Sequence, residues 1–152
     1  MRILIGILSL LMLTAPASAV TVRDCSDDAN TVSARNIMEP WEKNSRVFYN
    51  GQVRVALLDT GGEPACCSQH LLIISPSSED SEGASACHIV SDHDNFGFGS
   101  VDFAKLTAAY DPKKGLLIGF PFQISDMNGG APKPGTAKLR LNLAKGTLAA
   151  EK

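Results

Sequence analysis

The chain has 152 residues, of which 44% are hydrophobic and 20% are charged, and its formal net charge is −2. This length suffices for one domain with a substantial hydrophobic core. The negative charge and the few aromatic residues argue against binding to nucleic acid. We therefore expect a single folded domain whose partner is not a nucleic acid.

Residues 1–19 are typical of a secretory signal peptide. Arg2 supplies a positive charge, an apolar run follows over residues 3–13, and Ala17 and Ala19 place small side chains before the expected cleavage site. The apolar run is too short to span a bilayer, which takes about 20 residues. We expect cleavage before Val20 and a periplasmic or secreted mature protein without a membrane span.

Acidic and basic residues occupy different parts of the chain. Residues 55–104 contain no Lys or Arg but eight acids, whereas residues 105–152 contain eight bases and three acids. We favour an arrangement in which the two segments form neighbouring strands that neutralise each other. The alternative is an acidic surface that meets a cationic partner. Both stay open at this point, because summed charge does not reveal how charges group in space.

Most of the remaining sequence favours β-strands. Within residues 45–59, Asn50-Gly51 separates two β-prone arms and predicts a hairpin, because a type I′ turn needs positive φ at both central positions. In the second arm, Val53, Val55 and Leu57 would share one face. Further strands are expected at residues 70–75, 87–91, 100–110, 116–124 and 137–143, with a final short strand after Lys145-Gly146.

Seven or eight short strands with frequent turns predict an all-β domain, built as an antiparallel sandwich or a small barrel. Pro121 suggests that its strand is an edge strand or carries a bulge. Only residues 32–38 hint at a helix, which would stop before Pro40. We therefore divide the mature chain into a helical or irregular segment, residues 20–44, tethered by a disulfide, and a single all-β domain, residues 45–152.

The four cysteines are Cys25, Cys66, Cys67 and Cys87. In an oxidising compartment we expect all four to form disulfides, for which three pairings exist. We exclude a bond between Cys66 and Cys67, because neighbouring side chains on a strand point to opposite faces. Each of these two should then be bonded to Cys25 or Cys87. Both orders stay open, with a preference for Cys67 paired to Cys87.

Catalytic and metal-binding patterns provide weaker alternatives. The sequence contains no G-X-S-X-G, P-loop, H-E-X-X-H or dinucleotide-binding motif, so we expect neither enzymatic activity nor a cofactor. One alternative is a periplasmic protein that binds a metal or small ligand through His70, His88 and His93, with cysteine. A second alternative is a small hydrolase that uses carboxylates of the acidic segment.

A small, exported, disulfide-tied and all-β protein resembles the periplasmic inhibitors of lysozyme in size and class, although their Ser-Gly-X-X-Tyr motif is not present. We expect a non-enzymatic cell-envelope protein that binds another protein or an envelope component through loops at one end of the sheet. Phe96 and Phe98, flanked by glycines, would supply apolar contacts. A cationic partner would meet the acidic loop residues Glu79, Asp80, Glu82, Asp92 and Asp94.

Overall fold

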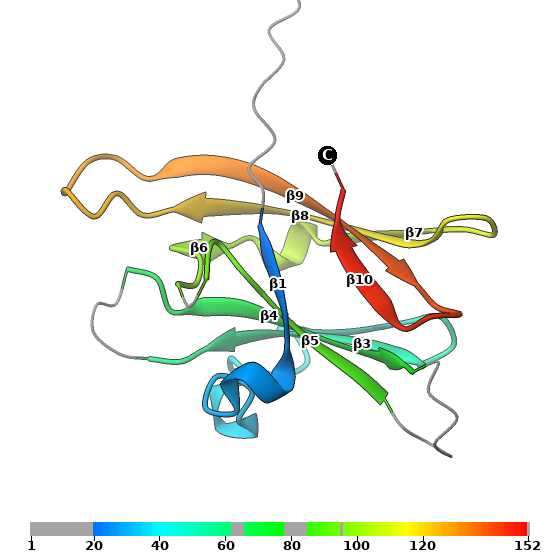
Figure 1. Ribbon diagram of the computed structural model, residues 1–152. Coiled ribbons are helices and arrows are strands. Elements are labelled where there is room, and N and C mark those ends of the chain that lie inside the picture. Colours follow the sequence, from blue (N-terminus) through cyan, green and yellow to red (C-terminus); the bar gives the residue numbers. More distant parts are fainter. Residues whose placement is uncertain (1–19, 62–65, 78–84, 95, 152) are drawn as a thin grey trace, which may run out of the picture.

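The computed structural model describes residues 20–61, 66–77, 85–94 and 96–151, which form two antiparallel sheets (Figure 1). The first sheet has the order β1-β5-β4-β3-β2, and the second has the order β10-β9-β8-β6 with β7 also paired to β8. The first sheet comprises β1 (Thr21–Asp24), β2 (Ser45–Phe48), β3 (Val53–Asp59), β4 (Gln69–Pro76) and β5 (Ser85–Ser91). The second comprises β6 (Ser100–Val101), β7 (Thr107–Asp111), β8 (Gly115–Ile124), β9 (Lys133–Asn142) and β10 (Thr147–Ala150). The predicted all-β class and the antiparallel sandwich are confirmed.

The main hydrophobic core lies between the two sheets. Successive side chains of a strand point to opposite faces, so alternation along each strand produces one buried face. On β3 the inward side chains are Val53, Val55 and Leu57, as predicted, and each is at most 2% exposed. The second sheet supplies the facing layer with Leu116, Ile118, Phe120, Phe122, Ala137, Leu139 and Leu141.

The N-terminal segment joins and covers the first sheet. β1 forms an edge strand of this sheet, and the chain then turns through two 3₁₀ helices, η1 (Cys25–Asp28) and η2 (Ala34–Asn36) (Figure 1). Cys25 is buried there in a second apolar cluster with Leu58, Leu72 and Ile89. The helical or irregular character predicted for this segment holds for residues 25–44, whereas residues 21–24 form a strand of the first sheet.

The disulfide that ties this segment differs from the predicted ones. Cys25 is bonded to Cys87. β1 pairs with β5 in a register that places Asp24 opposite His88, so the two cysteines come opposite each other one residue further on. All four cysteines are oxidised, as predicted. Both predicted pairings are wrong. The register of β1 on β5 places Cys25 beside Cys87, and this register depends on contacts between distant parts of the chain that the sequence does not show.

Cys66 and Cys67 are bonded to each other. The prediction excluded this bond on the assumption that both residues lie on a strand. They lie instead in the turn that precedes β4, which begins at Gln69. In a turn, neighbouring side chains are not held on opposite faces, and the reason for the exclusion does not apply.

The chain crosses from the first sheet to the second at Gly97-Phe98-Gly99, which we call the crossing segment. The Phe98 N–H donates to the Gln69 carbonyl oxygen of β4 at 2.7 Å. The Gly99 N–H donates to the Gln123 carbonyl oxygen of β8 at 2.8 Å. Two consecutive residues are thereby hydrogen-bonded to different sheets.

The Phe98 side chain belongs to the core. It is fully buried, and its ring centroid lies 4.8 Å from that of Phe122 and 5.7 Å from that of Phe120. The prediction that Phe98 offers an exposed apolar contact is therefore wrong. Its flanking glycines let the backbone pass close to both sheets, which turns the ring inward. Phe96, in contrast, is 43% exposed.

The single strand expected at residues 100–110 is broken into β6, a 3₁₀ turn η3 (Phe103–Lys105) and β7. Both β6 and β7 pair with β8. Pro121 lies between the two paired stretches, and its carbonyl oxygen accepts a hydrogen bond from the Asp102 N–H at 3.0 Å. In an antiparallel strand the N–H and C=O of one residue point to the same neighbouring strand. The side of Pro121 that has no N–H therefore faces the gap between β6 and β7, where no strand needs a donor. Because β8 also pairs with β9 on its other side, it is an interior strand. Of the two predicted alternatives, an edge strand or a bulge, the edge strand is therefore wrong.

The hairpin predicted at Asn50-Gly51 is confirmed between β2 and β3. Its turn is longer than two residues, since Phe48 pairs with Val53 and residues 49–52 connect them. Within this turn Tyr49, Asn50 and Gly51 all have positive φ, at 49°, 55° and 84°. The Tyr49 ring packs on Tyr110 of β7 with the ring centroids 5.4 Å apart. The hairpin tip therefore contacts the second sheet.

The acidic and basic segments lie mainly in different sheets. β3, β4 and β5 belong to the first sheet, whereas β7 to β10 belong to the second. Strand pairing between the two segments is limited to β6 on β8, and Lys105 also forms an ion pair with Asp102 at 2.6 Å. The favoured interpretation, neighbouring strands that neutralise each other, therefore holds only at this junction.

Proteolysis with a Glu-specific endoproteinase tests the disulfide pairing, because Glu42 and Glu79 lie on either side of the vicinal cysteines and the Glu63-Pro64 bond between them resists cleavage. We expect the non-reduced peptide of residues 43–79 to be released alone, lighter than its reduced form by the two thiol hydrogens. The peptide that contains Cys25 should stay joined to the one that contains Cys87. Mass spectrometry that finds peptide 43–79 linked to either of them would contradict this pairing.

Substitution of the two loop phenylalanines tests their different burial. Phe98→Ala removes a fully buried ring and should lower the free energy of unfolding by about 3–5 kcal/mol. Phe96→Ala, the matched control, should change it by about 0.5 kcal/mol or less. Urea denaturation of both variants measures the difference, and equal midpoints would place Phe98 outside the core.

Candidate functional site

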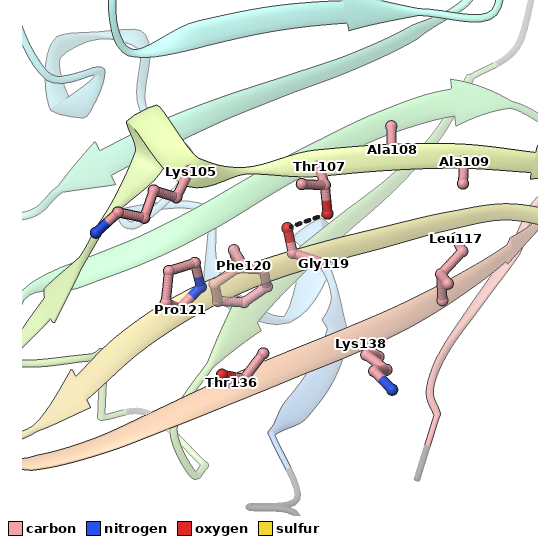
Figure 2. A pocket seen from close by; sticks show the side chains of 10 residues that line it. All are labelled: Lys105, Thr107, Ala108, Ala109, Leu117, Gly119, Phe120, Pro121, Thr136 and Lys138. Atoms are coloured by element: carbon pink, nitrogen blue, oxygen red, sulfur yellow. Dashed lines mark hydrogen bonds between the residues drawn. The ribbon is translucent and has the colours of Figure 1, made fainter.

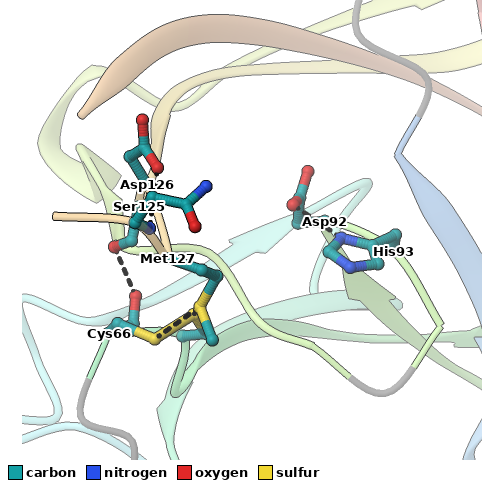
Figure 3. Close-up of a disulfide and its surroundings, with 8 residues drawn as sticks. Cys66, Asp92, His93, Ser125, Asp126 and Met127 are labelled. Carbon is teal, nitrogen blue, oxygen red and sulfur yellow. Dashed lines mark hydrogen bonds and ion pairs between the residues drawn. A yellow bond between two sulfur atoms is a disulfide. The ribbon is translucent and has the colours of Figure 1, made fainter. Parts of the chain in front are cut away.

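Three loops meet at one end of the sandwich and form a surface that we call the loop end, residues 66–67, 92–94, 96–97 and 125–127. Hydrogen bonds join the loops. The Gly97 N–H donates to the Cys67 carbonyl oxygen at 2.8 Å. The Ser125 hydroxyl donates to the Cys66 carbonyl oxygen at 2.6 Å (Figure 3). The vicinal cysteines are thus held from two sides through their carbonyl oxygens.

Gly97 brings the crossing segment unusually close to this turn. A Cβ atom at this position would lie 2.6 Å from the Cys67 carbonyl oxygen and 2.8 Å from His70 Nε2, closer than real Cβ atoms come. A side chain would therefore force the loops apart. Because residue 97 has no side chain, its N–H can come within hydrogen-bond distance of the Cys67 carbonyl oxygen.

Met127 covers the vicinal disulfide with its sulfur. Met127 Sδ lies 3.4 Å from Cys66 Sγ and 3.8 Å from Cys67 Sγ (Figure 3). A disulfide sulfur carries no proton, so both are van der Waals contacts. The rest of the methionine side chain faces solvent, and the residue is 64% exposed.

The loop after β5 contributes an acid, an imidazole and an aromatic ring. Asp92 Oδ2 lies 2.8 Å from His93 Nδ1, and the His93 ring stacks on that of Phe96 with the ring centroids 5.1 Å apart. The Phe96 N–H donates to the His93 carbonyl oxygen at 2.8 Å, and Asp94 has a positive φ of 40°. A tight turn therefore presents His93 and Phe96 on the surface.

A small pocket lies between these loops and is lined by Cys67, Asp92, His93, Phe96, Gly97, Ile124, Ser125 and Met127. Its volume is about 90 Å³. Pockets that enclose drug-sized molecules measure about 300–1,000 Å³. This one can take a single side chain or an ion but is too small for a nucleotide or a sugar ring.

The structure brings together only some of the predicted binding residues. Asp92, Asp94 and Phe96 lie at the loop end, whereas Phe98 is in the core. Sequence reasoning missed Met127 and the cysteine pair as parts of this surface, because nothing local places residues 66–67 beside residue 127. The predicted acids Glu79, Asp80 and Glu82 lie outside the described residues.

The three histidines proposed as alternative metal ligands do not converge. His70 is buried on β4, and its Nδ1 lies 2.9 Å from Ser91 Oγ. His88 Nε2 lies 3.0 Å from the Gly146 carbonyl oxygen, and His93 is paired within the loop end. In the described parts of the chain, no three or more His, Cys, Asp or Glu side chains form a group that could hold a metal.

A larger hollow lies on the outer face of the second sheet. It has a volume of about 390 Å³, and Gly119 forms its floor between Thr107 and Lys138, which pair with it on β7 and β9 (Figure 2). The hollow exists because Gly119, which points outward from β8, has no side chain to fill it. The Thr107 hydroxyl donates to the Gly119 carbonyl oxygen at 3.3 Å. Its remaining lining residues are Lys105, Ala108, Ala109, Leu117, Phe120, Pro121 and Thr136. The surface of this hollow is mainly apolar and belongs to a regular sheet, so the loop end is the better candidate.

No protein-family model matches the chain, and neither a curated protein nor a solved structure matches it. The loop end is therefore identified as the candidate site by its geometry alone.

Burial lowers the pKa of His70 below its ordinary value of 6.5, and the charge of Arg23 lowers it further, against the opposite effect of Asp28 and Asp59. The unfolded chain then takes up a proton below about pH 6.5 that the folded chain does not bind, so the free energy of unfolding should fall as the pH falls through that value. His70→Gln should lose this part of the pH dependence. Urea unfolding of both proteins between about pH 5 and 8 measures the difference. The same slope in both would contradict a neutral, buried His70.

Proposed function

We propose that this protein is an exported, non-enzymatic cell-envelope protein that binds a protein partner through the loop end. Two disulfides are compatible with an extracellular or periplasmic location, since disulfides persist in oxidising compartments. Among the described residues, no helix is long and apolar enough to cross a membrane. The disulfides support export.

The observation that carries the proposal is the exposure of two large apolar side chains at the loop end. Phe96 is 43% exposed and Met127 is 64% exposed, although they belong to different loops. Both contribute to the wall of the small pocket. Aromatic residues and methionine are enriched in protein interfaces, where a few such residues supply most of the binding energy.

The base under these side chains is well ordered by hydrogen bonds. The Gly97 N–H and the Ser125 hydroxyl hold the vicinal cysteines from the loops that carry Phe96 and Met127. A partner would therefore order few additional groups on binding, which favours affinity. The small pocket between the loops can accept one side chain of such a partner.

Charge at the loop end favours a cationic partner. Asp92, Asp94 and Asp126 belong to the two loops that carry Phe96 and Met127. Asp92 is mostly buried beside His93, whereas Asp94 is exposed and Asp126 is half-buried. Carboxylates at the rim of an interface raise the rate of association with a positively charged surface more than they raise affinity.

Phe96→Ala tests the apolar contact. A partner recovered from the cell envelope with the mature wild-type protein should bind this variant about 30-fold more weakly, which is about 2 kcal/mol. Tyr110→Ala is the matched control, because Tyr110 is 53% exposed on β7, beside the opposite end of β8. Surface-plasmon resonance measures both. Equal loss of affinity in both variants, or in neither, would contradict binding through the loop end.

The charge of the partner is tested separately with Asp94→Asn and Asp126→Asn together. We expect slower association and a weaker dependence of the association rate on salt, because screening acts on exposed charges. The dissociation rate should change little. An association rate that does not depend on salt in the wild type would contradict a cationic partner while leaving the apolar contact in place.

A further inference from the structure

Three sulfur atoms from two distant parts of the chain meet at the loop end. Met127 Sδ contacts Cys66 Sγ at 3.4 Å and Cys67 Sγ at 3.8 Å, across sequence separations of 61 and 60 residues. The pocket of about 90 Å³ beside them is lined by Cys67 and Met127. There is thus space for an ion next to the sulfur atoms.

These donors match the preference of one kind of metal. Thiolate and thioether sulfur select soft ions such as Cu⁺, whereas Mg²⁺ and Ca²⁺ take oxygen ligands. Three sulfur atoms placed about 2.3 Å from a central ion in a trigonal plane lie about 4 Å from one another. The two distances from Met127 already approach that spacing. Only the bonded pair of cysteine sulfurs would have to separate.

We propose that Cys66, Cys67 and Met127 form a binding site for one Cu⁺ ion that is open when the Cys66–Cys67 disulfide is reduced and closed when it is oxidised. The site goes beyond the binding of a protein partner and does not depend on it. It also differs from the histidine set considered at first, because its third donor is a thioether.

The backbone is arranged so that the sulfurs can separate without moving the loops. Cys66 is held through its carbonyl oxygen by the Ser125 hydroxyl, and Cys67 through its carbonyl oxygen by the Gly97 N–H. These hydrogen bonds do not involve the disulfide. When that bond opens, rotation about the two Cα–Cβ bonds moves the sulfurs while the main chain keeps its place beside Met127.

The opening step needs a dithiol as reductant. One thiolate of the dithiol attacks Cys66 or Cys67 sulfur and breaks the S–S bond, and its second thiolate then releases the mixed disulfide. Two electrons and two protons pass to the cysteines, and the dithiol leaves as a disulfide. Binding of Cu⁺ then displaces the thiol protons of Cys66 and Cys67 to solvent, because the metal ligand is the thiolate.

Titration of the mature protein with Cu⁺ in the absence of oxygen tests the site, with bicinchoninate as the competing chelator. After reduction by a dithiol and its removal, the wild type should bind about one equivalent, with thiolate-to-copper absorption in the near ultraviolet. The oxidised protein should bind none. Met127→Leu, which keeps the side-chain size, should lower the affinity at least about tenfold.

Cys66→Ser with Cys67→Ser, reduced in the same way, is the control for the other cysteine pair, since it keeps Cys25 and Cys87. It should bind no Cu⁺. Equal binding by this variant would assign the copper to Cys25 and Cys87 and overturn the proposal. Equal binding by the oxidised wild type, or an undiminished affinity of Met127→Leu, would overturn it as well. Near-ultraviolet circular dichroism shows that each variant is folded.

Discussion

The structure depends on the passage of the crossing segment between the two sheets. Within three residues the backbone hydrogen-bonds to Gln69 of the first sheet and Gln123 of the second. Phe98 fills the space between them and packs on the rings of the facing sheet. The backbone on either side of Phe98 can pass this close only because residues 97 and 99 have no side chains, since a Cβ atom on either glycine would overlap its neighbours. Glycine, phenylalanine and glycine in this order therefore join the sheets and complete the core.

The loop end takes its form from the same passage. Gly97 holds the turn of the vicinal cysteines, and Ser125, which lies directly after β8, holds it from the other sheet. The surface residues Phe96 and Met127 are thus displayed from a base that both sheets support.

Much of the fold could be predicted because burial of one face imposes a period of two on a strand. That period was visible on β3, with Val53, Val55 and Leu57, and a positive-φ turn was visible at Asn50-Gly51. For the candidate site, local sequence indicated that Phe96 lies on an exposed acidic loop. Phe98, two residues away in the same glycine-rich stretch, has the opposite burial. Glycine stands on both sides of Phe98 and on only one side of Phe96, but this difference decides burial only where two sheets lie close to the backbone.

By itself, the sequence determined that this protein is a small all-β domain with four oxidised cysteines. The periodicity and the turn residues are properties of short segments, and the cysteines can be counted without knowing where they lie in space. The tertiary structure decided which cysteines meet. Cys25 reaches Cys87 because β1 pairs with β5 in one register, and Cys66 reaches Cys67 because their turn is held by two other loops. It likewise decided that Met127 lies on that pair. Register and loop packing are set by the sum of contacts across both sheets, and no short stretch of the chain contains them.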